Sequence, residues 1–410
     1  MKTLPCHYGW VVAATGILVL FACIGLGRFG YTVLIPGMEA ELHLGYRQFG
    51  FIGTSNFFGY LVAVFFAPTV MVFLKPRLTA ALGLLLLALS MAAIAGCSSF
   101  SAILFCYTLA GLGTGFANIP MMALTSRWFA GSRRGRAAGL VICGNGLGIV
   151  FVGFAIPLFD RLFAAQGWRL SWLLLGTISL VIACCAVILL RNDPAELGLQ
   201  PVGADLAAAA EQAEEFRHRG HSGLLWRIGI PYALFGATFM VYGTFIVTSM
   251  VNEYGLSVQS AGRYWSWVGL FSLFSGLAFG TLSDRIGRRY GLITVFAVLA
   301  GAYLLAGVKY GIGGLLVSLT LYGLAVFAAP AIVVAAIGDH YPPEQVARAF
   351  SNATLLFAFG QTAGPAGAAL IAGPEGHFTT AYLVAALLTL FAGFWALSIP
   401  AHARGKPGKG

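Results

Sequence analysis

Residues 25–38 read Gly-Leu-Gly-Arg-Phe-Gly-Tyr-Thr-Val-Leu-Ile-Pro-Gly-Met and lie in the second half of the first long apolar segment. At their centre is Arg28, the one charged or histidine side chain that we place inside an apolar segment rather than at its end. A cation inside a membrane-spanning helix costs roughly 2.5–3.5 kcal/mol on insertion scales, which disfavours an unpaired, lipid-facing Arg28. We therefore expect Arg28 to face a water-filled cleft between two helical bundles and to attract an anionic solute.

The position of Arg28 along the first helix leaves an alternative open. If the helix continues to Met38, Arg28 lies only a few residues past its middle. If the helix ends near Tyr31, Arg28 lies close to the outer interface, where its side chain can snorkel to water or pair structurally.

The composition is that of a membrane protein. Of the 410 residues 59% are hydrophobic and only 9% are charged, whereas a soluble chain carries about a quarter charged residues. The excess of 24 Lys and Arg over 14 Asp and Glu does not indicate nucleic-acid binding, because the positive charge falls in short loops between apolar segments. The seven cysteines have no metal-ligand spacing, and we expect neither a metal nor a cofactor. The first apolar segment is too long for a signal peptide, so we expect it to stay in the protein.

Windows of about 20 apolar residues, the length of a spanning helix, identify twelve segments. They centre on residues 8–34, 49–73, 78–95, 102–124, 137–159, 170–190, 228–251, 264–282, 290–308, 315–337, 350–372 and 381–399. The sequence predicts an all-α membrane protein with two six-helix bundles, 1–190 and 227–410. Residues 191–226 between them are hydrophilic and are predicted to form a cytoplasmic linker with a short amphipathic helix.

Charge predicts the orientation. Most Lys and Arg residues fall in alternate loops on one side, which also holds both termini. By the positive-inside rule, we expect a multi-pass protein of the cell (inner) membrane with both termini in the cytoplasm.

An internal repeat supports two equivalent halves. Residues 108–112, Thr-Leu-Ala-Gly-Leu, recur as 320–324, Thr-Leu-Tyr-Gly-Leu, at an offset of 212. The same offset carries Arg136-Ala137 onto Arg348-Ala349 and places Arg127 opposite Asp339. Parallel six-helix repeats place the substrate path at the interface between the halves.

These features resemble the major facilitator superfamily. Residues 280–289, Gly-Thr-Leu-Ser-Asp-Arg-Ile-Gly-Arg-Arg, are similar to its cytoplasmic signature, whereas the first-half counterpart at 67–77 keeps only its basic end. Residues 7–12, 128–140 and 191–201 resemble the monocarboxylate transporter and oxalate/formate antiporter branch. The 25–38 stretch looks instead like related uncharacterised bacterial carriers. The resemblance implies a major facilitator fold and transport by alternating access.

One departure limits what this resemblance implies. Monocarboxylate transporters carry a carboxylate-binding arginine inside the eighth span, but residues 264–282 contain none. The eleventh-span lysine of the oxalate antiporter is also missing from 350–372. Carboxylate binding would therefore have to come from Arg28, on a different helix.

Polar side chains inside the spans are further candidates for substrate binding. A buried amide needs a hydrogen-bond partner, which is either a neighbouring helix or a solute. By analogy with where such carriers bind, we include aromatic side chains that carry a hydroxyl. The candidates besides Arg28 are Tyr31, Asn56, Asn118, Asn145, Tyr242, Tyr322 and Gln361.

The charged residues at the ends of spans are candidates for a gate. An acid beside several arginines can bridge the cytoplasmic ends of the two halves in the outward-open state and release when solute binds. We expect this role for Asp284, Arg285, Arg288 and Arg289, and for a related pair of Arg127 and Asp339. Plain positive-inside charge is the alternative, but it does not explain Asp284.

These observations predict a secondary active transporter for a small organic anion, with a monocarboxylate as the expected substrate. No acid or histidine lies inside a span, so anion exchange, uniport or symport with a substrate-borne proton remain open. The alternatives are an efflux transporter for neutral or amphipathic compounds and a non-transporting membrane sensor. We expect a monomer that binds a small molecule and, besides that, protons or a counter-anion, but no nucleic acid.

Overall fold

The computed structural model describes residues 7–129, 132–163, 166–203, 223–341, 343–372 and 377–400, and this part of the chain is almost entirely helical. The helices of the first half are α1 (Gly9–Leu20), η1 (Phe21–Phe29), α2 (Gly30–Leu42), α3 (Tyr46–Gly96), α4 (Phe100–Trp128), α5 (Ser132–Phe163), α6 (Gly167–Leu189) and η3 (Pro194–Leu197). Those of the second half are α8 (Leu224–Asn252), α9 (Val258–Ile286), α10 (Arg288–Val308), α11 (Gly311–Ala325), α12 (Ala328–Gly338), α13 (Pro343–Ala372) and α14 (Thr379–Ala396).

The described helices cross the bilayer twelve times, as the sequence predicts. Eleven continuous helical segments among the described residues are long and apolar enough to span a membrane. One of them, α3, has 51 residues and would be about 77 Å long as a straight helix, far more than one crossing needs. It breaks at Lys75, whose backbone is non-helical, and so supplies two spans.

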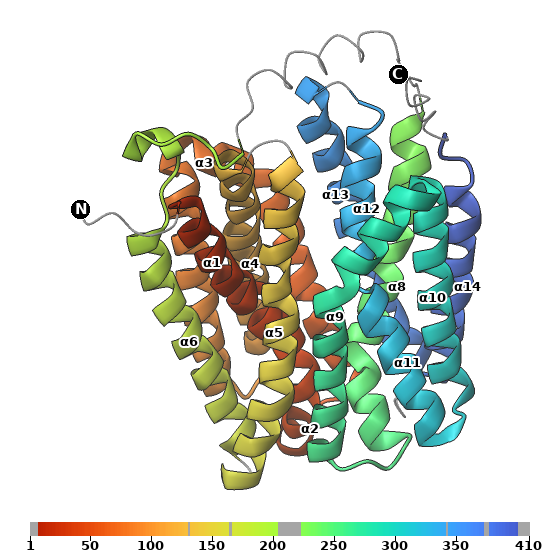
Figure 1. Ribbon diagram of the computed structural model, residues 1–410. Coiled ribbons are helices and arrows are strands. Elements are labelled where there is room, and N and C mark those ends of the chain that lie inside the picture. Colours follow the sequence, from red (N-terminus) through yellow and green to blue (C-terminus); the bar gives the residue numbers. More distant parts are fainter. Residues whose placement is uncertain are drawn as a thin grey trace.

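Figure 1 shows the helices in two groups, with α1 to α6 on one side and α8 to α14 on the other. We call the membrane face that carries Lys75, Arg191 and Gly287 the linker side. The opposite face, which carries Gly45 and Lys309, is the far side. The amphipathic helix expected in 191–226 falls largely on residues 204–222, which lie outside the described part of the chain.

The internal repeat reappears in the helix packing. A Cβ placed on Gly111 would lie 1.8 Å from the carbonyl oxygen of Asn56, so α4 and α3 touch through backbone at this point. A Cβ on Gly323 would lie 2.9 Å from the carbonyl oxygen of Val268, where α11 meets α9. Each partner pair is separated by the same 212 residues that separate the two sequence motifs. Adding 212 to both residue numbers of the first contact therefore gives the second contact, so the repeat in the sequence is also a repeat in helix packing.

The two halves meet on the far side and near the middle of the membrane. Thr32 Oγ1 donates to the carbonyl oxygen of Gly243 at 2.5 Å, and the side-chain amide of Asn252 donates to the hydroxyl of Tyr46. In the middle, α5 and α9 touch through glycine: a Cβ on Gly146 would lie 2.8 Å from the carbonyl oxygen of Gly269. The structure is thus a conformation closed at its far side.

Candidate functional site

Arg28 lies near the middle of its span. The helix continues without a break from Gly9 to Leu42, through the π-helical segment η1 that contains Arg28. The alternative of a helix ending near Tyr31, with Arg28 at the outer interface, is therefore wrong. The side chain is 6% exposed, so it does not lie in lipid, and it is more enclosed than an open water-filled cleft would make it.

The guanidinium of Arg28 rests on aromatic rings, and two of its three nitrogens have no hydrogen-bond partner among the described residues. Its central carbon lies 4.9 Å from the ring centre of Phe57 and 4.6 Å from that of Tyr60, both on α3. Its Nε and Nη2 are buried, and neither has a hydrogen-bond partner among the described residues. A desolvated cation–π contact contributes about 2 kcal/mol, whereas an uncompensated buried charge costs several kcal/mol. The described part of the protein therefore holds a buried cation with two nitrogen atoms that make no hydrogen bond there.

Tyr60 links Arg28 to a second predicted residue. The side-chain amide of Asn118, on α4, donates to the Tyr60 hydroxyl at 3.2 Å. Tyr60 and Val64 also pack against Ala358 of α13, in the second half. Arg28, Tyr60 and Asn118 therefore gather where the two halves meet, which is where the sequence places a substrate path.

Two further candidates of the first half have partners within that half. The hydroxyl of Tyr31 donates to the carbonyl oxygen of Phe49 at 2.7 Å. The Asn56 amide donates to the carbonyl oxygen of Tyr107 at 3.2 Å, although its own oxygen has no partner in the described part of the chain. Both bonds connect neighbouring helices of one bundle, which is the structural alternative considered for such residues.

The tyrosines of the second half likewise have internal partners. Tyr242 bonds the Ser318 hydroxyl at 2.8 Å, and Tyr322 donates to the carbonyl oxygen of Phe239 at 2.8 Å. Their rings stack with centres 4.3 Å apart. Tyr242 and Tyr322 therefore contact each other inside the second bundle, and these hydrogen bonds and this stacking do not involve Arg28.

Two further candidate amides, like Asn56, lack full hydrogen bonding among the described residues. Asn145 of α5 is 4% exposed and its side-chain oxygen has no partner among the described residues. Gln361 of α13 is fully buried, and neither its nitrogen nor its oxygen has a partner there. Buried polar atoms in native proteins nearly always have a hydrogen-bond partner. These amide atoms are therefore positions where a bound solute would gain hydrogen bonds.

Sequence reasoning did not identify Phe57 and Tyr60, the two rings beneath Arg28. The chain contains 32 Phe and 15 Tyr, so their residue types carry no signal by themselves. Their spacing of three places them on one face of α3, but only the position of Arg28 shows that this face matters.

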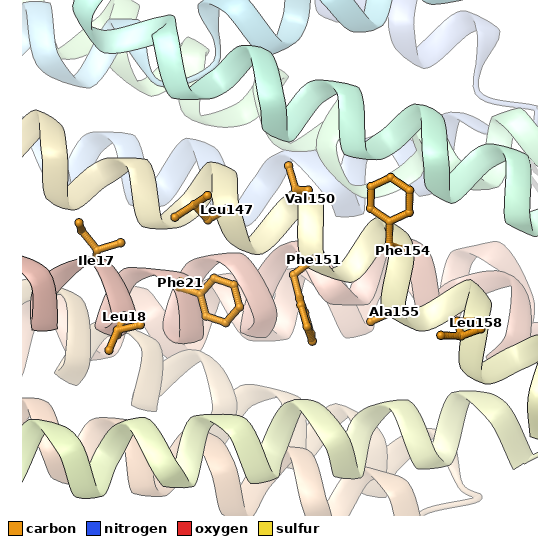
Figure 2. A pocket seen from close by; sticks show the side chains of 9 residues that line it. All are labelled: Ile17, Leu18, Phe21, Leu147, Val150, Phe151, Phe154, Ala155 and Leu158. Carbon is orange, nitrogen blue, oxygen red and sulfur yellow. The ribbon is translucent and has the colours of Figure 1, made fainter.

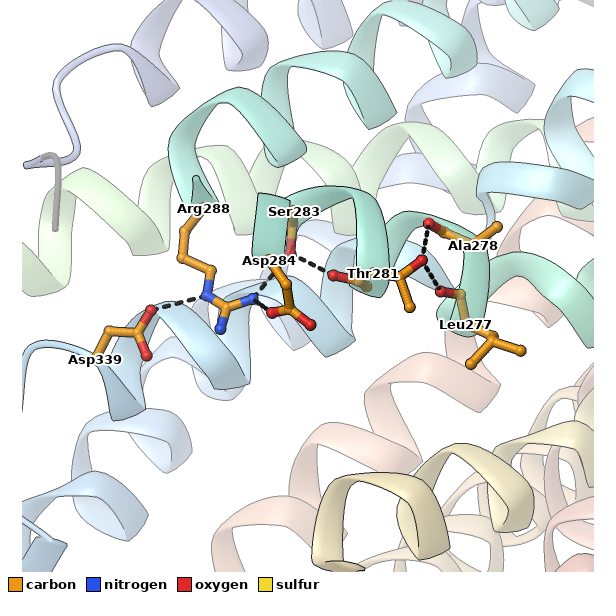
Figure 3. A network of polar contacts seen from close by, with 8 residues as sticks. Leu277, Ala278, Thr281, Ser283, Asp284, Arg288 and Asp339 are labelled. Atoms are coloured by element: carbon orange, nitrogen blue, oxygen red, sulfur yellow. Dashed lines mark hydrogen bonds and ion pairs between the residues drawn. The ribbon is translucent and has the colours of Figure 1, made fainter. Parts of the chain in front are cut away.

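The predicted gate forms an ion network inside the second half, shown in Figure 3. Arg288, at the start of α10, contacts the carboxylate of Asp284 and donates its Nε to Asp339 at 2.8 Å. Its Nη1 also donates to the hydroxyl of Ser283 at 3.0 Å. The network therefore connects α9, α10 and the end of α12.

Two of the other gate candidates, Arg285 and Arg289, lie close to this network in the sequence. Arg289 lies over the ring of Tyr290, with 4.5 Å to the ring centre. Arg127 and Arg285 are exposed. The expected pair of Arg127 and Asp339 is not formed in this conformation, because Asp339 is paired with Arg288.

An apolar groove on the outside of the first half is separate from this site. Figure 2 shows it lined by Ile17 and Phe21 of the first span and by Leu147, Phe151 and other apolar residues of α5. Leu147 is 44% exposed, which places the groove on the outer surface rather than between the halves. It carries no polar side chain that could orient an ion.

Comparison with known proteins gives relatives of one kind. Two strains of Mycobacterium tuberculosis contain an uncharacterised MFS-type transporter 27% identical over 68% of this chain, and the match spans 60% of that relative's length. A hexuronate transporter of Bacillus subtilis is 24% identical over 93% of this chain and 92% of its own. Human monocarboxylate transporter 11 is 26% identical over 71% of this chain and 62% of its own.

The fold and the family follow from two further matches. A solved D-xylose–proton symporter superposes with a TM-score of 0.77 over 98% of this chain and all of its own, at 15% identity, which shows the major facilitator fold. A family model described as "Uncharacterised MFS-type transporter YbfB" matches residues 20–397. This chain therefore belongs to that family of major facilitator superfamily transporters.

Proposed function

We propose that this protein is a secondary active transporter that moves a small organic anion, a monocarboxylate, across the cell membrane by alternating access. The observation that carries the proposal is the buried guanidinium of Arg28, whose Nε and Nη2 have no partner among the described residues. An anion is the chemistry that such a group lacks, and a carboxylate can accept two parallel hydrogen bonds from it. Hexuronates and monocarboxylates, named for two of the relatives, are both organic anions.

The closed far side supports a rocking mechanism. In this conformation, contacts such as Thr32 with Gly243 join the halves on one side of Arg28. Alternating access requires these contacts to open and the linker side to close. The Asp284–Arg288 network, together with Arg285, Arg289 and Arg127, is proposed as the linker-side gate, with the ion pairs exchanging partners between the two states.

The charge distribution supports an orientation. We propose that the linker side faces the cytoplasm, because most Lys and Arg residues flank the spans on that side. The protein would then be a multi-pass inner-membrane protein with cytoplasmic termini, and it would act as a monomer. Coupling to protons or exchange for a second anion are both compatible with this arrangement.

The test is uptake of labelled lactate, pyruvate, formate and oxalate into proteoliposomes. Arg28→Gln should lower uptake of the transported anion by roughly 10- to 100-fold, because a hydrogen bond to a charged group contributes about 1.5–3 kcal/mol. Arg28→Lys should be intermediate, since it keeps the charge but loses the planar fork. Arg263→Gln, which changes an exposed arginine at the start of α9, is the matched control and should transport normally.

Thermal stability without substrate separates binding from structure. Removing an unpaired buried charge should leave Arg28→Gln at least as stable as the natural protein. A strongly destabilised Arg28→Gln protein would indicate a structural role. Unchanged uptake would remove Arg28 from the mechanism.

Export of neutral or amphipathic compounds is the second candidate. Four stacked rings favour it, because Tyr232, Phe235 and Phe239 of α8 and Phe357 of α13 form a buried aromatic cluster. Dye export by proteoliposomes that does not depend on anions or on Arg28 would support this candidate against the first.

A further inference from the structure

Gln361 is the most unusual polar side chain of the second half. It is fully buried in the middle of α13, and neither its Nε2 nor its Oε1 has a hydrogen-bond partner among the described residues. A buried amide without partners is costly, and native proteins rarely keep one without a reason. Unlike Arg28, an amide offers a donor and an acceptor side by side.

The packing of α13 on α3 gives the height of Gln361 in the membrane. The two helices run in opposite directions. A Cβ on Gly50 would lie 2.2 Å from the Cβ of Ala369, one on Gly53 lies 3.9 Å from the Cβ of Pro365, and Tyr60 clusters with Ala358. Residue numbers that increase along α3 are thus paired with residue numbers that decrease along α13. This register places Gln361 opposite Phe57.

Phe57 is one of the two rings beneath the guanidinium of Arg28. Gln361 and the guanidinium therefore lie at the same height, on opposite halves of the protein. Arg28 belongs to the first half and Gln361 to the second.

The direction of Gln361 follows from the neighbours of α13. Phe357, Gly360 and Gly364 lie against α8, where a Cβ on Gly360 would be 1.9 Å from the carbonyl oxygen of Ala233. Ala358 and Pro365 lie against α3. With 3.6 residues per turn, position 361 falls between these two faces and points into the angle between α3 and α8.

We propose that Gln361 binds the C2 hydroxyl of a 2-hydroxy acid whose carboxylate is held by Arg28. The inference rests on the proposed function and assigns its substrate class. A hydroxyl can donate to Oε1 and accept from Nε2, so it satisfies both open atoms of the amide. A 2-oxo acid offers an acceptor only, and an unsubstituted acid offers neither. A ligand held from both sides would also tie the halves together, as a solute that triggers closure must do.

Three acids of one size test this assignment: lactate, pyruvate and propionate carry a hydroxyl, an oxo group and hydrogen at C2. Their affinities are measured from thermal shifts of the full-length protein in detergent and from competition in proteoliposome uptake. The natural protein should bind lactate about tenfold or more tightly than propionate, with pyruvate between them.

Gln361→Leu should bring the lactate-to-propionate ratio close to one while propionate binding is retained. Thr362→Val is the matched control, because the Thr362 hydroxyl bonds the Ala358 carbonyl of its own helix at 2.8 Å. It should keep the natural ratio. If Gln361→Leu does not fold, Gln361→Asn, with its amide withdrawn by one methylene, should lower the ratio.

The outcomes separate this inference from the proposed function. An unchanged ratio in Gln361→Leu, with all binding lost in Arg28→Gln, would overturn the role of Gln361 and leave the anion site standing. Natural protein that binds propionate as well as lactate would also overturn it. Binding of all three acids that survives in Arg28→Gln would overturn the proposed function itself.

Discussion

The turn at Lys75 in the first half and the turn at Gly287 in the second lie 212 residues apart, at equivalent positions of the repeat. Their backbones agree, with φ 59° and ψ 156° at Lys75 and φ 95° and ψ 152° at Gly287. Glycine adopts this conformation freely, whereas for lysine it is a strained region that costs about 1–3 kcal/mol. The fold thus imposes one backbone on two different residues.

The chemistry around the two turns differs. In the second half Arg288 pairs with Asp284 and Asp339. In the first half Arg77 donates its Nε to the backbone carbonyl of Val187 at 2.9 Å. The positions equivalent to Asp284 and Arg285 are Val72 and Phe73, which are 78% and 79% exposed. The repeat therefore preserves the shape of the turn in both halves, but among the described residues ion pairs that could exchange partners are found at only one of the two turns.

Among changes at the two turns, the largest effect is expected from breaking the ion network. Arg288→Gln removes both of its ion pairs, and we expect transport to fall about tenfold because the proposed gate loses a charge that both acids share. The effect on stability should be only about 1 kcal/mol, since Asp284 is 60% exposed and screened by solvent. Uptake assays and thermal unfolding measure the two quantities separately.

Arg77→Gln is the comparison variant from the first half. Within the described residues it removes bonds to the backbone and no ion pair, so it should reduce stability while the turnover of the folded protein stays near the natural value. Equal losses of transport in Arg77→Gln and Arg288→Gln would contradict a gate confined to the second half.

A smaller effect is expected from putting a side chain on Gly287. A Cβ there would meet no atom within 4 Å, so Gly287→Ala tests backbone strain alone. We expect a loss of about 1–3 kcal/mol, seen as a lower melting temperature in detergent. Gly280→Ala also has open space around its Cβ, but its helical backbone suits alanine, so it should stabilise by up to about 1 kcal/mol. A drop of the same size in both variants would show that strain is not the cause.

The smallest effect is expected from relieving Lys75. Lys75→Gly should raise the melting temperature slightly, because the relieved strain of about 1–3 kcal/mol exceeds the entropy cost of a glycine, about 1 kcal/mol at most. Lys75→Ala keeps the strain and removes only the charge, so it should give no gain. A gain in the alanine variant would attribute the effect to the charge instead.

The sequence alone predicted the spans, the fold class and the repeat. The length of each apolar segment indicates a membrane crossing, and the shared offset of 212 indicates equivalent helix contacts. It could not show the face on which Arg28 lies. The π-helical segment Phe21–Phe29 has a different number of residues per turn from an α-helix. A helical wheel drawn with α-helical spacing therefore gives the wrong direction for the side chains that follow. The strain at Lys75 is likewise a property of the backbone that a basic residue does not reveal.

The candidate site was only partly predictable for a similar reason. Asn56 and Gln361 are both amides inside apolar spans, and no sequence pattern distinguishes them. In the structure Asn56 donates to a neighbouring helix, whereas Gln361 has no partner among the described residues. What separates a packing residue from a candidate ligand contact is the register between α3 and α13, which is a property of the assembled helices.

The exposed Val72 and Phe73 have a consequence for how deep each turn sits in the bilayer. Apolar side chains at a helix end gain free energy in the boundary between headgroups and acyl chains. The charged residues Asp284 and Arg285 gain it in water instead. We therefore expect the turn of the first half to lie in the lipid surface and the equivalent turn of the second half to stand above it, in water.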